Sequence, residues 1–382
     1  MAVTLPIAMA AGMMGTARNN VAVASFGGAS GVGGLALAAT LGGGVSGIFA
    51  GSLADRFAAQ RILITVNLCF ALSALTLWLL VFTSALTPLE SMTLAAIDGA
   101  LTALSVTSVV KLQVATVPAK AKGAAEVLNG LKASLGALAG VFVTTRLGGD
   151  SAVIVICAVL FSLVAALVAA GRFRAPAAED HPSAPPATFG TLLRAIVRDH
   201  GLRDVVIADL VMYLVLPTIL LGLAVVDEAI PEYSPLFVSV GIVGVLIGRL
   251  VLAARGTSGR VPLALTLAAL TYAALAITAL VLMDGDWKIG HIAALAFVAM
   301  AGSACGSFIQ ALLAAKVQER LPDELRARGT GFLYGLRAIK VAIGVIVVTY
   351  FVTVWTTRVY LGVLTLLLLA VVIGLRGFRR VT

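Results

Sequence analysis

The chain has 382 residues, of which 60% are hydrophobic and 12% are charged, and its formal net charge is +9. Its mean hydropathy is +1.07, whereas a soluble domain is about half apolar and about a quarter charged. A water-soluble fold of this length could not bury so much apolar surface. The basic residues stand in short gaps between apolar segments, a pattern of membrane proteins that excludes nucleic acid as the partner.

Twelve segments are long and apolar enough to cross the hydrocarbon core of a bilayer as helices, for which about 20 residues are needed. A chain in hydrocarbon must satisfy its backbone hydrogen bonds within itself, and an α-helix does so. The expected spans are 3–26, 29–53, 62–85, 91–116, 123–146, 151–171, 204–226, 234–254, 261–283, 289–316, 328–353 and 357–375.

One long gap divides these spans into two groups of six. We therefore expect an N-terminal six-helix bundle at 1–171, a cytoplasmic linker at 172–203 and a C-terminal six-helix bundle at 204–382. Residues 179–186 of the linker have the charged, proline-rich composition of a spacer. Residues 192–198 have an apolar side opposite two arginines, which favours a helix lying along the membrane surface.

The distribution of lysine and arginine predicts the orientation of the chain. If the N-terminus is cytoplasmic, eighteen of the 27 lysine and arginine residues fall in cytoplasmic gaps and three fall in the opposite gaps. Short cytoplasmic loops of membrane proteins carry this positive excess. The sequence thus predicts a multi-pass protein of the cytoplasmic (inner) membrane with both termini in the cytoplasm.

Two stretches about half a chain apart resemble each other. Residues 111–133 and 316–338 each contain a K-x-Q triplet, then a proline, two basic residues, and a G-L-(K/R)-A sequence. Both stretches end one expected span and open the next on the same side. Parallel repeats of six spans occur in a large class of secondary transporters, which bind their substrate between the repeats.

The gap after the second expected span reads GSLADRFAAQR over residues 51–61. This resembles the cytoplasmic signature between helices 2 and 3 of the major facilitator superfamily, although Ala58 replaces a usual glycine and Gln60 a usual basic residue. The resemblance implies an all-α membrane protein with 12 transmembrane helices in two pseudo-symmetric six-helix bundles. It implies transport by alternating access, with no catalytic residue, metal or cofactor.

The charged residues of this segment are candidates for a gate. Asp55 stands where a helix is expected to end, next to Arg56, and a carboxylate there can pair with an arginine and accept hydrogen bonds from a neighbouring helix N-terminus. We expect Gly51, Asp55, Arg56 and Arg61 to hold the two halves together on the cytoplasmic side and to separate when the halves rock. The alternative is a charged turn that only anchors the topology.

Glycines recur at four-residue spacing on two of the expected spans. Gly43, Gly47 and Gly51 line one side of the second span, and Gly331 and Gly335 line one side of the eleventh. Such spacing allows two helix backbones to approach closely. The family resemblance implies that these two spans face each other across the halves, and static packing within one half is the alternative.

Polar residues inside the spans are candidates for substrate binding or proton coupling, because ionisable groups in hydrocarbon are costly and usually face a cavity or a partner. Arg18 and Asn19 interrupt the first span, and Asp98 lies deep in the fourth. A structural pair between Asp98 and a basic neighbour is the alternative. Lys132 and Arg337 occupy equivalent repeat positions and could attract an anionic group or extend to the surface. Further ionisable residues in the spans are Lys111, Glu126, Asp209, Arg249 and Lys340.

These features predict a monomeric secondary transporter that exports a small amphipathic solute, coupled to protons, with Asp98 as the coupling residue and membrane lipids around it. The exporter resemblance is partial, because residues 136–142 lack the proline of the usual fifth-helix signature. A solute importer and a lysophospholipid flippase of the same superfamily are alternatives, the latter because residues 111 and 129–131 faintly resemble that group. An enzyme is disfavoured, since His181, His200 and His291 are scattered.

Overall fold

The computed structural model is helical throughout the residues that it describes. These are residues 4–26, 29–117, 122–147, 149–170, 189–200, 202, 203, 206, 234–255, 289–322, 325, 326, 328–338 and 342. Six helices in this part are long and apolar enough to cross a membrane. The spans predicted at 261–283 and 357–375 lie outside the described residues. So do the span at 204–226 except for residue 206, and nearly all of the span at 328–353 beyond residue 338.

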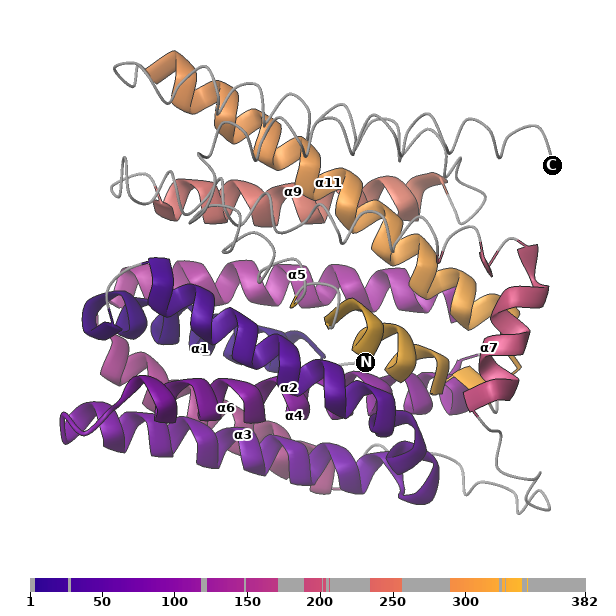
Figure 1. Ribbon diagram of the computed structural model, residues 1–382, viewed down its shortest axis with the longest axis horizontal. Coiled ribbons are helices and arrows are strands. Elements are labelled where there is room, and N and C mark those ends of the chain that lie inside the picture. The colour runs from indigo at the N-terminus through magenta and orange to yellow at the C-terminus, as the bar shows by residue number, and fades with distance from the viewer. Residues whose placement is uncertain are drawn as a thin grey trace. The chain divides into compact units, whose positions relative to one another are not determined.

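The helix bounds lie within four residues of the predicted ones (Figure 1). The chain forms two compact units, Met1–Arg203 with Ala314–Ile339, and Asp204–Leu313 with Lys340–Thr382. The predicted domain boundaries at 171 and 203 stay predictions. The helices are α1 (Thr4–Phe26), α2 (Ala29–Arg56), α3 (Ala59–Phe82), α4 (Pro88–Thr116), α5 (Lys122–Leu147), α6 (Asp150–Ala169), α7 (Phe189–Arg198), α9 (Ser234–Arg255) and α11 (Ile289–Arg320).

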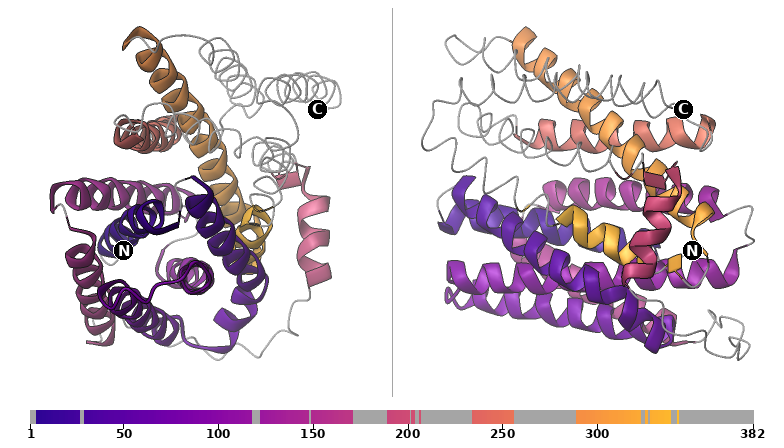
Figure 2. Two further views of the ribbon diagram at one scale, coloured as in Figure 1. Left: turned by 60° about the vertical axis from the view of Figure 1, so that its left-hand side comes forward. Right: turned by 45° about the vertical axis from the view of Figure 1, so that its right-hand side comes forward.

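The short α7 is oriented differently from the spans of its unit. α1 to α6 run side by side along one direction, and α7 lies across their ends (Figures 1 and 2). The predicted amphipathic helix at 192–198 is therefore present, and it lies crosswise to the spans, as a helix on a membrane surface does.

The turn between α3 and α4 explains why α3 ends at Phe82 and α4 begins at Pro88, each three residues from the predicted edge. Ser84 has a φ of 53°, and the amides of Ser84 and Ala85 donate to the carbonyl oxygens of Val81 and Leu80. This pair of hydrogen bonds is a Schellman motif, which closes a helix.

The start of α4 is defined by a capping box. The Glu90 amide donates to Thr87 Oγ1 over 3.3 Å, and the Thr87 amide donates to Glu90 Oε2 over 2.8 Å. Pro88 occupies the first helical position, where its missing N–H costs nothing. The sequence Thr-Pro-Leu-Glu thus starts the helix earlier than its apolar pattern does.

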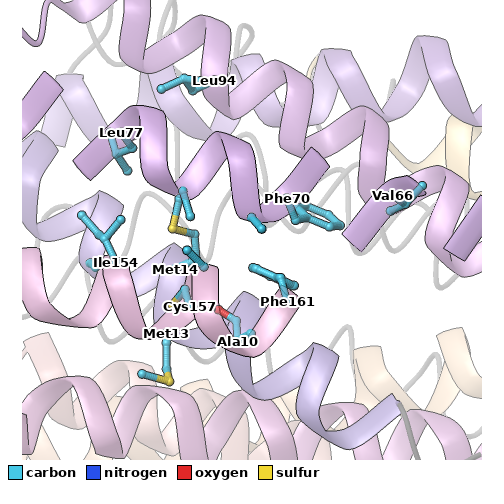
Figure 3. Packing of buried hydrophobic residues seen from close by; sticks show 14 of the residues in the cluster. Ala10, Met13, Met14, Val66, Phe70, Leu77, Leu94, Ile154, Cys157 and Phe161 are labelled. Carbon is cyan, nitrogen blue, oxygen red and sulfur yellow. Dashed lines mark hydrogen bonds between the residues drawn. The ribbon is translucent and has the colours of Figure 1, made fainter. Parts of the chain in front are cut away.

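The helices α1 to α6 enclose an apolar core (Figure 3). α3 packs against α4 and α6, while α1 packs against α5 and α6. Phe70 of α3 stacks on Phe161 of α6 with 4.9 Å between the ring centroids. Met13 of α1 and Leu77 of α3 are fully buried in the same core.

The outer sides of α3 and α6 expose large apolar side chains at intervals of three or four residues, which places each set on one side of its helix. A soluble protein would rarely expose so large an apolar surface. In a bilayer the lipid tails cover it, so these sides face lipid. The exposed residues are Leu68, Leu72, Leu75, Leu79 and Phe82 on α3, and Ile156, Val159, Leu163 and Leu167 on α6.

Helix backbones approach each other closely at glycines. A Cβ atom added at Gly42 of α2 would lie 2.0 Å from the carbonyl oxygen of Ala96 on α4. In the second unit, a Cβ atom added at Gly248 of α9 would lie 2.0 Å from the carbonyl oxygen of Ala304 on α11. Between helices in lipid this close packing takes the role that the hydrophobic effect has in water.

We predict that Gly42→Ala lowers the melting temperature of the detergent-purified protein. The added methyl group would overlap the Ala96 carbonyl oxygen, and overpacking of this kind costs about 1–3 kcal/mol. Gly33→Ala on the same helix is the matched control, because a Cβ atom there meets nothing within 4 Å and alanine favours helix. Equal melting temperatures for the two variants would contradict the packing described here.

Candidate functional site

Arg18 of α1 and Asp98 of α4 form an ion pair inside the first unit. Arg18 Nη2 lies 2.7 Å from Asp98 Oδ2, and the two side chains are 9% and 14% exposed. Leu94 and Leu101, which flank Asp98 on α4, belong to the apolar core or pack against it. With a rise of about 1.5 Å per residue, Asp98 lies about 15 Å along α4 from its start at Pro88. The pair is therefore well inside a membrane span.

The hydrogen-bonding capacity of this pair is only partly used. Asp98 Oδ1 and Arg18 Nε are buried without a hydrogen-bond partner among the described residues. The hydroxyl group of Ser73 on α3 lies near the Asp98 carboxyl group, but not in hydrogen-bond geometry. An unused acceptor on a buried charge is costly. This arrangement can accept a proton, a water molecule or a donor group of a ligand.

Asn19, the third polar residue predicted for this region, does not join the pair. Its side chain is exposed. The next residue, Asn20, donates from Nδ2 to Asp150 Oδ1 over 2.9 Å, at the first residue of α6. α1 therefore lies beside the start of α6 at Asn20, on the side of the membrane opposite the predicted cytoplasmic loops.

The signature segment spans the end of α2 and the start of α3. Arg56 and Arg61 are exposed, and the side chain of Asp55 lies outside the described part of the structure. Gly51 is buried, and a Cβ atom added there would lie 2.6 Å from the Cα atom of Arg328. Gly51, one of the four residues predicted to form a gate, therefore lies against the second repeat.

Lys111 holds the end of α2 from the neighbouring α4. Its Nζ donates hydrogen bonds to the carbonyl oxygens of Ala54 and Phe57, the latter over 3.1 Å. The last carbonyls of a helix lack internal partners and carry partial negative charge, which a lysine compensates. From the sequence, Lys111 is identified only as a charge inside a span. Its position near the end of that span, opposite the C-terminus of another helix, is the feature from which this role could have been predicted.

The two glycine-lined helix sides meet within the first unit. A Cβ atom added at Gly47 of α2 would lie 2.8 Å from the Cα atom of Gly335, in the helical segment 328–338. A Cβ atom added at Gly331 of that segment would lie 2.8 Å from the Gly47 carbonyl oxygen. One turn further along α2, Tyr334 Cε1 lies 3.2 Å from the Cβ position of Gly43. The expected backbone contact is therefore present.

Lys132 and Arg337, the equivalent positions of the repeat, lie on different elements. Lys132 is half-buried on α5, and Arg337 is half-buried in the segment 328–338. Tyr334, three residues before Arg337 in the same segment, is also half-buried. The structure thus brings Arg18 and Asp98 together, places Arg337 one helical turn from Tyr334, and leaves Asn19 outside the ion pair.

Several solved membrane proteins share this fold. The E. coli fucose:proton symporter FucP is similar with a TM-score of 0.68 and 15% identity, over 98% of this chain and 97% of that chain. The nucleoside transporter NupG is similar with a TM-score of 0.64 and 14% identity, over 97% and 98%. The human organic anion transporter MFSD10 is similar with a TM-score of 0.69 and 12% identity, over 97% of each chain.

Comparison with curated proteins finds no match. The structural similarities establish the fold, which confirms the predicted all-helical architecture of twelve spans in two bundles. The sequence itself matches the Major Facilitator Superfamily over residues 1–344. The chain therefore belongs to the Major Facilitator Superfamily, and it is a multi-pass membrane transporter of that family.

Proposed function

We propose that this transporter exports a small, amphipathic solute across the cytoplasmic (inner) membrane in exchange for protons, with Asp98 as the group that binds and releases the proton. The observation that carries the proposal is the ion pair of Arg18 and Asp98, which is buried in a membrane span and has a carboxylate oxygen without a hydrogen-bond partner among the described residues. Buried ionisable residues of membrane proteins commonly mark proton or substrate pathways.

An arginine that loses its counter-charge inside a membrane span is costly. When Asp98 binds a proton, Arg18 is left buried without a counter-charge, and breaking a buried pair in this way costs about 3–5 kcal/mol. The cost is relieved in a conformation where water or an anionic group reaches Arg18. Protonation of Asp98 therefore shifts the balance between two conformations, which is what coupling requires.

The gate in this proposal is the cytoplasmic end of α2. Gly51, Asp55, Arg56 and Arg61 would close the cytoplasmic side against the segment 328–338 and open it when the halves rock. Two observations support this role. The helix backbones come into close contact at Gly47 and at Gly51, where α2 has no side chain that would have to move when the helices separate. Lys111 also holds the last carbonyls of α2 in place.

The solute would meet Asn19, which follows Arg18 in the outer half of α1, and Lys132 and Arg337 would attract an anionic group that it carries. We propose a monomer with both termini in the cytoplasm. Import is the alternative direction, since two proteins of similar structure are a fucose:proton symporter and a proton:xylose symporter. A lysophospholipid is the alternative cargo.

We predict that Asp98→Asn destabilises the protein by about 3–5 kcal/mol, because it leaves Arg18 buried and uncompensated. The double variant Arg18→Gln/Asp98→Asn should recover most of this loss, since both charges are then removed. Thermal unfolding of the wild type, both single variants and the double variant measures the coupling energy. Additive losses would show that the two side chains do not act as a pair.

We further predict that Arg18→Gln/Asp98→Asn abolishes proton coupling while the solute still binds. A screen for metabolites, drugs and lysophospholipids that raise the melting temperature identifies the ligand. Proteoliposomes containing an internal pH dye then report proton movement when this ligand is added. The wild type and Asp98→Glu should respond, and the double variant should respond like empty vesicles.

A double variant that still moves protons with the solute would remove Asp98 from the mechanism. The direction is tested in everted membrane vesicles, whose acidic interior should drive accumulation of the ligand if the protein exchanges it for protons. Accumulation in right-side-out vesicles under an inward proton gradient would instead establish import.

A further inference from the structure

The helix α7 has three chemically different sides. Residues four apart lie one above the other on a helix, and neighbouring residues are about 100° apart around it. Leu192 and Ile196 form a buried side, with 2% and 3% exposure. Leu193 and Val197 form an apolar side that is 45% and 54% exposed. One step further round, Arg194 and Arg198 form an exposed basic side.

The buried side attaches α7 to the end of α11 and to the segment that follows it. A Cβ atom added at Gly329 would lie 3.5 Å from Leu192 Cδ1 and 2.6 Å from Leu321 Cδ1. Beyond the end of α7, Asp199 Oδ1 accepts from Arg320 Nη1 over 2.5 Å and from the Leu202 amide over 3.0 Å. One side of α7 and its C-terminal end are thus tied to the protein.

Within the part of the chain that the structure describes, the other two sides are exposed, and they fit a lipid surface. α7 lies across the ends of the spans (Figure 2), so its long axis runs along the plane of the membrane. A helix in that position places apolar side chains among the acyl chains and basic side chains among the headgroups. The basic side is at the cytoplasmic end according to the predicted topology, where the leaflet is rich in anionic lipids.

We propose that α7 is a docking surface for anionic phospholipid headgroups. Leu193 and Val197 enter the acyl region, while Arg194 and Arg198 bind headgroup phosphates. Arginine suits this role because its planar guanidinium can donate two hydrogen bonds to one phosphate. The surface is separate from the ion pair of Arg18 and Asp98, so the proposal holds whichever solute is moved and in either direction.

This surface is connected to the end of α2 through two adjacent residues. Arg328 lies against Gly51 of α2, and Gly329 lies against Leu192 of α7. A shift of α7 toward or away from the membrane would therefore move the segment that packs on α2. Anionic lipid should accordingly favour the conformation in which this segment stays in contact with α2.

Site-directed spin labelling tests the proposal. Val197→Cys is introduced into the full chain together with Cys69→Ala and Cys305→Ala, and the buried Cys157 is kept. In proteoliposomes of phosphatidylcholine with phosphatidylglycerol, a label at 197 should collide more with oxygen, which concentrates in lipid, than with a water-soluble nickel chelate. A label at Thr191, which is exposed and lies on the basic side of α7 next to Arg198, is the matched control and should collide more with the nickel chelate than with oxygen.

The charge dependence distinguishes anionic headgroups from lipid in general. Arg194→Gln/Arg198→Gln should raise the phosphatidylglycerol fraction needed for half-maximal immersion of the 197 label by more than about fivefold. Arg146→Gln, which removes an exposed arginine stacked on Phe142 at the far end of α5, should leave it unchanged. Equal water exposure at 191 and 197, or immersion of 197 that is the same in pure phosphatidylcholine, would overturn the proposal.

Discussion

Close contact between helix backbones at small residues is the constraint on which the rest of this structure depends. Lipid tails are as apolar as the helix sides, so burial of leucine alone gives two spans little reason to associate. The carbonyl of Met9 on α1 would lie 2.5 Å from a Cβ atom at Gly140 of α5, and that of Met300 on α11 would lie 2.2 Å from one at Gly244 of α9. The helix pairs of both units thus depend on glycine, and any larger side chain there separates them.

The sequence could predict the spans well because a bilayer imposes a minimum length and an apolar composition on each helix. It predicted helix ends less well, since these depend on local hydrogen bonds that hydropathy does not contain. The hydroxyl of Thr87 and the carboxylate of Glu90 extend α4 toward its start. Ser84, a serine in a conformation that glycine usually takes, ends α3 early.

The candidate site was predictable in its chemistry and less so in its geometry. Arg18 and Asp98 stood out as charges inside spans, and a buried charge needs a partner. Which charges pair depends on the rotation of each helix about its axis, and the sequence does not determine it. Asn19 is adjacent to Arg18 but points to a different side of α1. Lys111 bonds the end of α2 because its long stem reaches there, which depends on the spacing of α2 and α4.

The charged residues of the described part of the chain occupy two kinds of position, inside the hydrocarbon and at helix ends. The ion pair of Arg18 with Asp98 lies in the hydrocarbon and is enclosed by helices of a single unit, where a change of charge acts directly on helix packing. Arg56, Arg61 and the pair of Arg320 with Asp199 lie at helix ends and are exposed to varying degrees. Solvent and headgroups screen such charges. Glycine contacts connect these two regions along α2, because Gly42 packs against Ala96 of α4, near Asp98, and Gly51 packs against Arg328 at the cytoplasmic end. A rearrangement around Asp98 therefore has a direct path to the cytoplasmic end.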